Sequence, residues 1–79
     1  MVTIYRAQGL RVVIFVNDPE PAPMQVFGDG EAKIELIGPD GEPELIWAEG
    51  MSRSEVRRAM QLVAGQQAAF LARWREIHD

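Results

Sequence analysis

Short runs of β-branched, aromatic and other apolar residues, separated by turn-forming residues, fill the first fifty positions of the chain. This pattern is typical of antiparallel strands, and it predicts strands over 2–7, 10–17, 24–27, 32–37 and 44–48. The second strand is apolar on both faces in its middle, so we expect it to be central and covered on both sides. The proline-rich segment 18–23 cannot continue a central strand and predicts a stiff, extended connector.

Three glycine-containing segments predict the turns between these strands. Gln8-Gly9 is a tight-turn signal, and Gly28-Asp29-Gly30 is expected to supply the positive φ of a hairpin. In Gly38–Gly41, proline presets φ at the second position and the last glycine takes the left-handed conformation. Strands joined in this way form a four- to five-stranded antiparallel β-meander.

The last third of the chain has the spacing of an amphipathic helix. Ser52 and Glu55 fit a capping box, with Ser52 as the N-cap. Apolar residues at intervals of three and four continue through Gly65, so we expect one long helix, bent or broken near Gly65, rather than two helices at an angle. The expected fold is a single α+β domain over 1–79, with a sheet over 2–48 and a helix over 52–78. The helix should cover one sheet face through Val56, Met60, Val63, Phe70 and Trp74.

Composition narrows the function classes. The chain has 79 residues, no cysteine and a net charge of −4, which argues against thiolate chemistry, a Cys/His zinc site, a basic nucleic-acid binder and a polybasic membrane patch. The longest apolar run, 12–16, is too short to span a membrane. Arg6 and Arg11 interrupt the region where a signal peptide needs apolar residues, so we expect a cytoplasmic protein.

The inventory of catalytic side chains is short. The single histidine, His78, is the penultimate residue, and both serines lie in the predicted helix cap. No Ser/His/Asp set can be assembled from these residues, so we expect no catalytic residue, no cofactor and no bound metal. Carboxylates at i, i+2 spacing could hold a cation or act as an acid–base pair. Their positions in turns favour plain solvated residues.

Charge is distributed unevenly along the chain. Residues 1–50 hold nine acidic and three basic residues, whereas residues 51–79 hold five basic and three acidic ones. An acidic sheet half attracts basic proteins and repels nucleic acid. The meander should bring the 18–20 and 40–44 carboxylates to one end of the sheet and leave the 29–31 pair apart. The candidate partner-binding residues are Asp18, Glu20, Asp29, Glu31, Asp40, Glu42 and Glu44.

Several residues resemble a small family of uncharacterised bacterial proteins. Members open with Pro-Thr-Ile-x-Arg, carry Asp-His-x-Pro-Pro-His-x-His-Val and continue into a glycine-rich hairpin. The matching positions are Thr3, Ile4, Arg6, Gly9, Asp18, Pro21, Val26, Gly28, the run 31–34, the Ser-Arg-x-Glu helix start at Ser52, and Trp74. The family often looks like half of a toxin–antitoxin-type module, which implies the same role for this chain.

The chain differs from that family at the only family residues that could carry out chemistry, which are three histidines. Those histidines are replaced here by Pro19, Pro23 and Gln25. If the family histidines bind metal or move protons, this chain cannot do so. The residues of that segment that are retained are Asp18, Pro21 and Val26. They are typical of positions that support the fold.

A small, acidic, non-enzymatic domain also resembles, by class, the phage-encoded anti-CRISPR proteins that occupy DNA-binding surfaces of the type I Cascade complex. The likeness implies a DNA-mimicking inhibitor whose acidic surface meets Cascade subunits in the host cytoplasm, without binding nucleic acid or membrane, as a monomer or weak homodimer. One alternative is a toxin–antitoxin-type component. Another is an interaction domain that forms homodimers through the helix.

Overall fold

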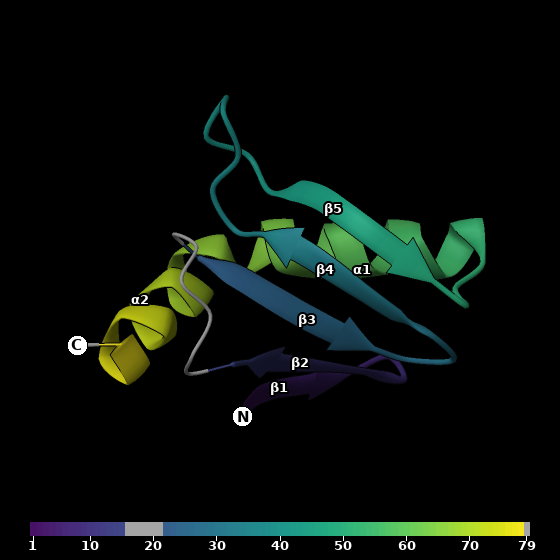
Figure 1. Ribbon diagram of the computed structural model, residues 1–79, viewed down its shortest axis with the longest axis horizontal. Helices are drawn as coiled ribbons and strands as arrows, with labels where there is room; N and C mark the ends of the chain where they lie inside the picture. Colours follow the sequence, from purple (N-terminus) through teal and green to yellow (C-terminus); the bar gives the residue numbers. More distant parts are fainter. Residues whose placement is uncertain (16–21, 79) are drawn as a thin grey trace.

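The fold is a five-stranded antiparallel sheet with two helices on one of its faces (Figure 1). The computed structural model describes residues 1–15 and 22–78. The strands are β1 (Val2–Ala7), β2 (Leu10–Ile14), β3 (Pro23–Phe27), β4 (Glu31–Glu35) and β5 (Glu44–Glu49), followed by α1 (Arg53–Gly65) and α2 (Gln67–His78). Each strand pairs with the next along the chain, which confirms the α+β meander. β2 ends at Ile14, and positions 16–17 of the predicted strand and 18–21 of the predicted connector lie outside the described residues. Pro23, expected in the connector, is the first residue of β3.

Two of the predicted turns have the expected geometry. Gln8 and Gly9 have φ of 55° and 75° and join the paired residues Ala7 and Leu10. Two consecutive positive φ values match the right-handed twist of a two-residue hairpin. In the β4–β5 connection, the Gly41 N–H donates to the Gly38 carbonyl at 3.0 Å, and Gly41 has φ of 88°.

The prediction for the 28–30 hairpin is correct in place but wrong in its reason. Neither Gly28 nor Gly30 has a positive φ. Glycine is needed for space instead: a Cβ on Gly28 would lie 2.5 Å from Glu55 Oε2, and one on Gly30 would meet the backbone of Glu49 and Gly50. The hairpin therefore lies directly against the start of α1 and the end of β5.

The helical segment is broken next to Gly65, where the sequence predicts a bend or a break, and it forms two helices. α1 ends at Gly65, and the Gln66 N–H is shared between the Leu62 and Val63 carbonyls. Gln67 then donates through Nε2 to the carbonyls of Leu36 and Gly41, both at 2.8 Å. These bonds tie the start of α2 to the β4–β5 connection. A continuous 26-residue helix would be about 39 Å long, longer than the 34 Å extent of the molecule.

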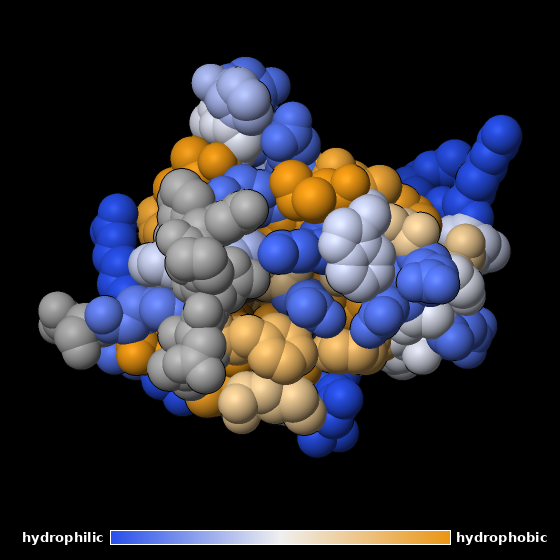
Figure 2. All heavy atoms as spheres, viewed as in Figure 1, coloured by the Kyte–Doolittle hydropathy of each residue, from blue (hydrophilic) through white to orange (hydrophobic). Residues whose placement is uncertain are grey.

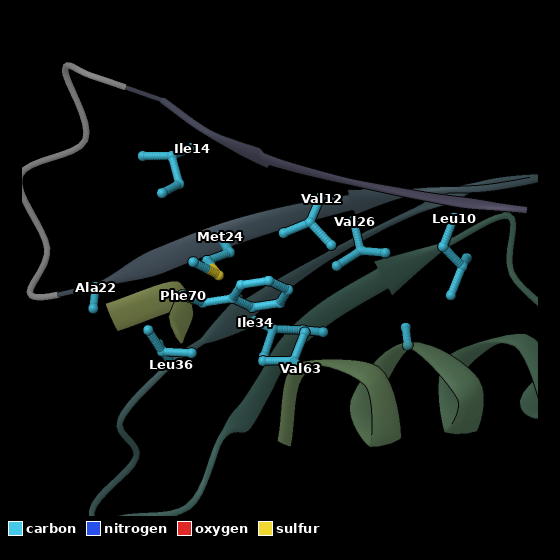
Figure 3. Packing of buried hydrophobic residues seen from close by; sticks show 11 residues of the cluster. Leu10, Val12, Ile14, Ala22, Met24, Val26, Ile34, Leu36, Val63 and Phe70 are labelled. Carbon is cyan, nitrogen blue, oxygen red and sulfur yellow. The ribbon is translucent and has the colours of Figure 1, made fainter. Parts of the chain in front are cut away.

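The core lies between the helices and the inner face of β2, β3 and β4 (Figure 3). Val63 from α1 and Phe70 from α2 meet Met24 and Ile34 there. Val12, Val13 and Ile14 are all fully buried, which confirms that β2 is covered on both faces.

The buried face of α1 differs from the predicted one. It runs through Glu55, Ala59 and Val63, whereas Val56 and Met60 are only partly buried. The prediction was correct for the buried Val63 and Phe70, and the predicted Met60 and Trp74 are partly buried and pack against the core. The prediction missed the burial of Glu55, because a glutamate in a sequence indicates an exposed position unless its hydrogen-bond partner in the fold is known.

Candidate protein-binding surface

Strand register decides which β5 side chains face the helices. Directly paired residues of an antiparallel sheet point to the same face, so Leu45 and Ala48 follow Ile34 and Ala32 onto the inner face. The register shift beside Ile34 makes Ile46 the unpaired, bulged residue of β5. Trp47 consequently lies opposite Lys33 on the outer face, the face away from the helices.

Two pairs of glutamates lie opposite each other on this outer face. Glu31 pairs with Glu49 at one end of the β4–β5 ladder, and Glu35 pairs with Glu44 at the other. Like charges directly opposite each other destabilise a sheet. Glu35 is buried, and its Oε2 accepts hydrogen bonds from the Ala22 and Leu36 amides, at 3.2 and 3.1 Å, which offset part of the cost of burying its carboxylate. Glu44 and Glu49, by contrast, are exposed.

β5 is an edge strand and is exposed along its whole length. Its three large apolar residues, Leu45, Ile46 and Trp47, are 38%, 45% and 37% exposed. Figure 2 shows apolar residues over this edge, interspersed with polar ones. We call the residues 44–49 the acidic β5 edge. Edge strands usually carry charge to prevent pairing with other chains, and here the charge is confined to the two ends.

On the same outer face, the part of the sheet farthest from β5 carries positive charge. Arg6 pairs with Arg11 on the outer face, and the Arg11 guanidinium lies 5.1 Å from the centre of the Phe27 ring. On the outer face, two arginines therefore lie on β1 and β2, whereas β4 and β5 carry four glutamates and one base, Lys33. This polarity would orient an approaching basic protein toward β5.

The predicted carboxylates fall into two groups at opposite ends of β4. Asp29 and Glu31 belong to the β3–β4 hairpin, whereas Asp40, Glu42 and Glu44 belong to the β4–β5 connection and the start of β5. The separation matches the expected meander. Asp18 and Glu20 lie outside the described residues, so their clustering with 40–44 stays a prediction.

Not every predicted carboxylate is free for a partner. Asp40 Oδ1 accepts a hydrogen bond from the Glu42 N–H at 3.1 Å, so it helps to shape its own turn. The sequence reasoning missed Glu49 and the apolar residues between Glu44 and Glu49. An apolar run bounded by two glutamates was visible, but its exposure depends on β5 being the edge strand.

Residues 1–15 and 22–78 contain no group of three His, Cys, Asp or Glu side chains placed to hold a metal ion. His78 stacks on Trp74 with ring centres 3.9 Å apart, and its Nδ1 lies 2.9 Å from the Trp74 carbonyl oxygen. Within the same ranges no helix is long and apolar enough to cross a membrane.

Comparisons with known proteins do not assign this chain to a family or a function. No protein-family model, curated protein or solved structure matches this chain. Function is therefore inferred from the surface itself.

Proposed function

We propose that this chain is a non-enzymatic protein-binding domain that inhibits its partner by occupying a basic surface. The observation that carries the proposal is the acidic β5 edge, where exposed Leu45, Ile46 and Trp47 lie between Glu44 and Glu49. An interface of this kind combines an apolar centre with a charged rim. The charge selects basic partners, and the apolar residues supply area to bury.

The charge pattern favours a protein over a nucleic acid. The phosphate backbone is attracted by Lys and Arg, whereas acidic residues outnumber the one base, Lys33, on the β4–β5 part of the outer face. Carboxylates in such an array can take the place of phosphates on a protein that normally binds DNA or RNA. The partner class that follows is a nucleic-acid-binding protein, and inhibition follows from competition for its basic groove.

The particular partner proposed is the type I Cascade complex, which follows from the chain's likeness in size and charge to anti-CRISPR proteins. The test measures displacement of a labelled target DNA duplex from purified Cascade by fluorescence anisotropy. We expect the unmodified chain to displace the duplex. The double variant Glu31→Lys with Glu49→Lys should fail to do so, because it reverses one of the two glutamate pairs.

The matched control is Glu76→Lys, which makes the same type of charge change on α2, where the Glu76 side chain is 67% exposed. It should displace DNA as well as the unmodified chain does. Absence of displacement by the unmodified chain would refute Cascade as the partner. Displacement by the double variant at unchanged affinity would refute the acidic-surface mechanism.

A further inference from the structure

The following inference rests on the proposed function and concerns how the acidic β5 edge makes contact. We propose that β5 accepts an extended, cationic segment of its partner as a sixth strand. β5 pairs with β4 on one side and with no other described strand, so backbone groups along its other side are open to a ladder. Strand addition of this kind takes affinity from the main chain and specificity from alternate side chains.

The side chains of β5 define the chemistry of the added strand. Glu44 and Glu49 both lie on the outer face at the ends of β5, and Leu45 and Ala48 lie on the inner face. Because Ile46 is bulged, a regular five-residue segment aligned with β5, like Glu31–Glu35 of β4, would place both terminal side chains on the outer face beside the glutamates. Lysine or arginine at those ends, with apolar residues between them, complements the edge in both charge and hydropathy.

A second copy of the chain is a poor occupant of the same edge. Two copies could pair all six β5 residues in one antiparallel register. That register places Glu44 of each copy opposite Glu49 of the other, so the contact occurs at both ends of the paired strands. Within each chain these residues already lie opposite Glu35 and Glu31. Each end of such a dimer would thus carry four carboxyl groups in a row across four strands. The glutamates therefore keep the edge from self-pairing and leave it open to a cationic strand.

Substitution of one glutamate tests this register without knowledge of the partner. In Glu44→Lys, the same antiparallel register brings each new ammonium group opposite Glu49 of the other copy. We expect the unmodified chain to sediment as a monomer and Glu44→Lys to sediment as a dimer with its 44–49 amides protected from hydrogen exchange. Glu42→Lys is the matched control, because it changes charge equally on an exposed residue outside the strand. It should remain monomeric.

Three results of that measurement would overturn the inference. A monomeric Glu44→Lys variant would show that β5 does not pair along its edge. A dimeric Glu42→Lys variant would show that net charge, not register, controls association. An unmodified dimer with protected β5 amides would make a second copy the natural occupant. Circular dichroism of each variant establishes that the fold is intact.

A synthetic peptide separates strand addition from simple charge attraction. The probe has five residues, with lysine at both ends and β-branched residues between, and is titrated into isotope-labelled protein while amide shifts at 44–49 are followed. N-methylation of alternate residues blocks the hydrogen bonds of one peptide edge and leaves its charge unchanged. We expect one of the two alternate methylation patterns to abolish binding and the other to preserve it.

The peptide results test strand addition separately from the proposed acidic binding surface. Equal binding of both methylated peptides would refute strand addition while leaving an acidic protein-binding surface in place. Failure of the unmethylated peptide to bind at millimolar concentration would also refute strand addition. The proposed function is tested separately, by the DNA displacement measured with the unmodified chain and with the Glu31→Lys and Glu49→Lys double variant.

Discussion

At the residue scale, Glu55 is the side chain whose role departs most from its local sequence signal. The Glu55 N–H donates to Ser52 Oγ at 3.1 Å, as the capping box predicts. The Glu55 carboxylate is 4% exposed and accepts a hydrogen bond from the Asp29 N–H at 3.0 Å, so it does not turn back to Ser52. It thus fastens α1 to the β3–β4 hairpin, and its Oε1 has no hydrogen-bond partner among the described residues.

Removal of the Glu55 carboxylate should destabilise the fold. In Glu55→Ala the Asp29 N–H loses a charged acceptor, a change that costs about 1.5–3 kcal/mol. Glu55→Gln keeps an oxygen acceptor and should cost less. Urea unfolding of both variants measures the difference, with Glu76→Ala on the exposed face of α2 as a near-neutral control. Equal losses for alanine and glutamine would show that the hydrogen bond to Asp29 contributes nothing.

At the element scale, Gly28 and Gly65 differ in what surrounds them. A Cβ on Gly28 would meet Glu55 Oε2 at 2.5 Å and Leu10 Cδ2 at 2.9 Å. A Cβ on Gly65 would meet nothing within 4 Å, and Gly65 is the last residue of α1. The first glycine permits a contact between elements, and the second only weakens a helix end.

Alanine at these two glycines should change stability in opposite directions. Gly65→Ala should stabilise the chain by up to about 1 kcal/mol, because alanine loses less backbone entropy than glycine in a helix. Gly28→Ala should destabilise it, because the hairpin must move away from Glu55 and Leu10. Thermal unfolding of the two single variants tests both directions. A destabilised Gly65→Ala variant would mean that the break at Gln66 requires glycine beside it.

The elements that local chemistry determines could be predicted from the sequence. The Gln8-Gly9 turn and the Ser52 cap depend on adjacent residues, and both have the expected geometry. A bend or break near Gly65 could be predicted, but the bonds from Gln67 to the distant Leu36 and Gly41 carbonyls that hold the start of α2 could not. The candidate site was predicted only in part. Its acidic residues are visible in sequence, but the apolar centre of the β5 edge becomes a surface only through the strand order.

At the scale of the whole molecule, charge separates across the sheet. Arg6 and Arg11 face outward on β1 and β2, and Glu31, Glu44 and Glu49 do so on β4 and β5. A net charge of −4 therefore understates the local field at the β5 edge. Fields from exposed charges are screened over about 10 Å at 0.1 M salt.

Partner binding should weaken as salt concentration rises. The association rate should fall most, because long-range steering depends on unscreened charge. A salt series of surface plasmon resonance measurements with Cascade gives the two rate constants separately. An association rate that does not change with salt would contradict a role for the acidic surface in steering.

The central claim is that the acidic β5 edge is the contact surface. Hydrogen–deuterium exchange of the chain, free and bound to Cascade, tests it most directly. We predict that binding slows exchange at the amides of 44–49 and leaves α1 unchanged. Slowed exchange on α1 around Arg53, Arg57 and Arg58, with the 44–49 amides unaffected, would contradict the account.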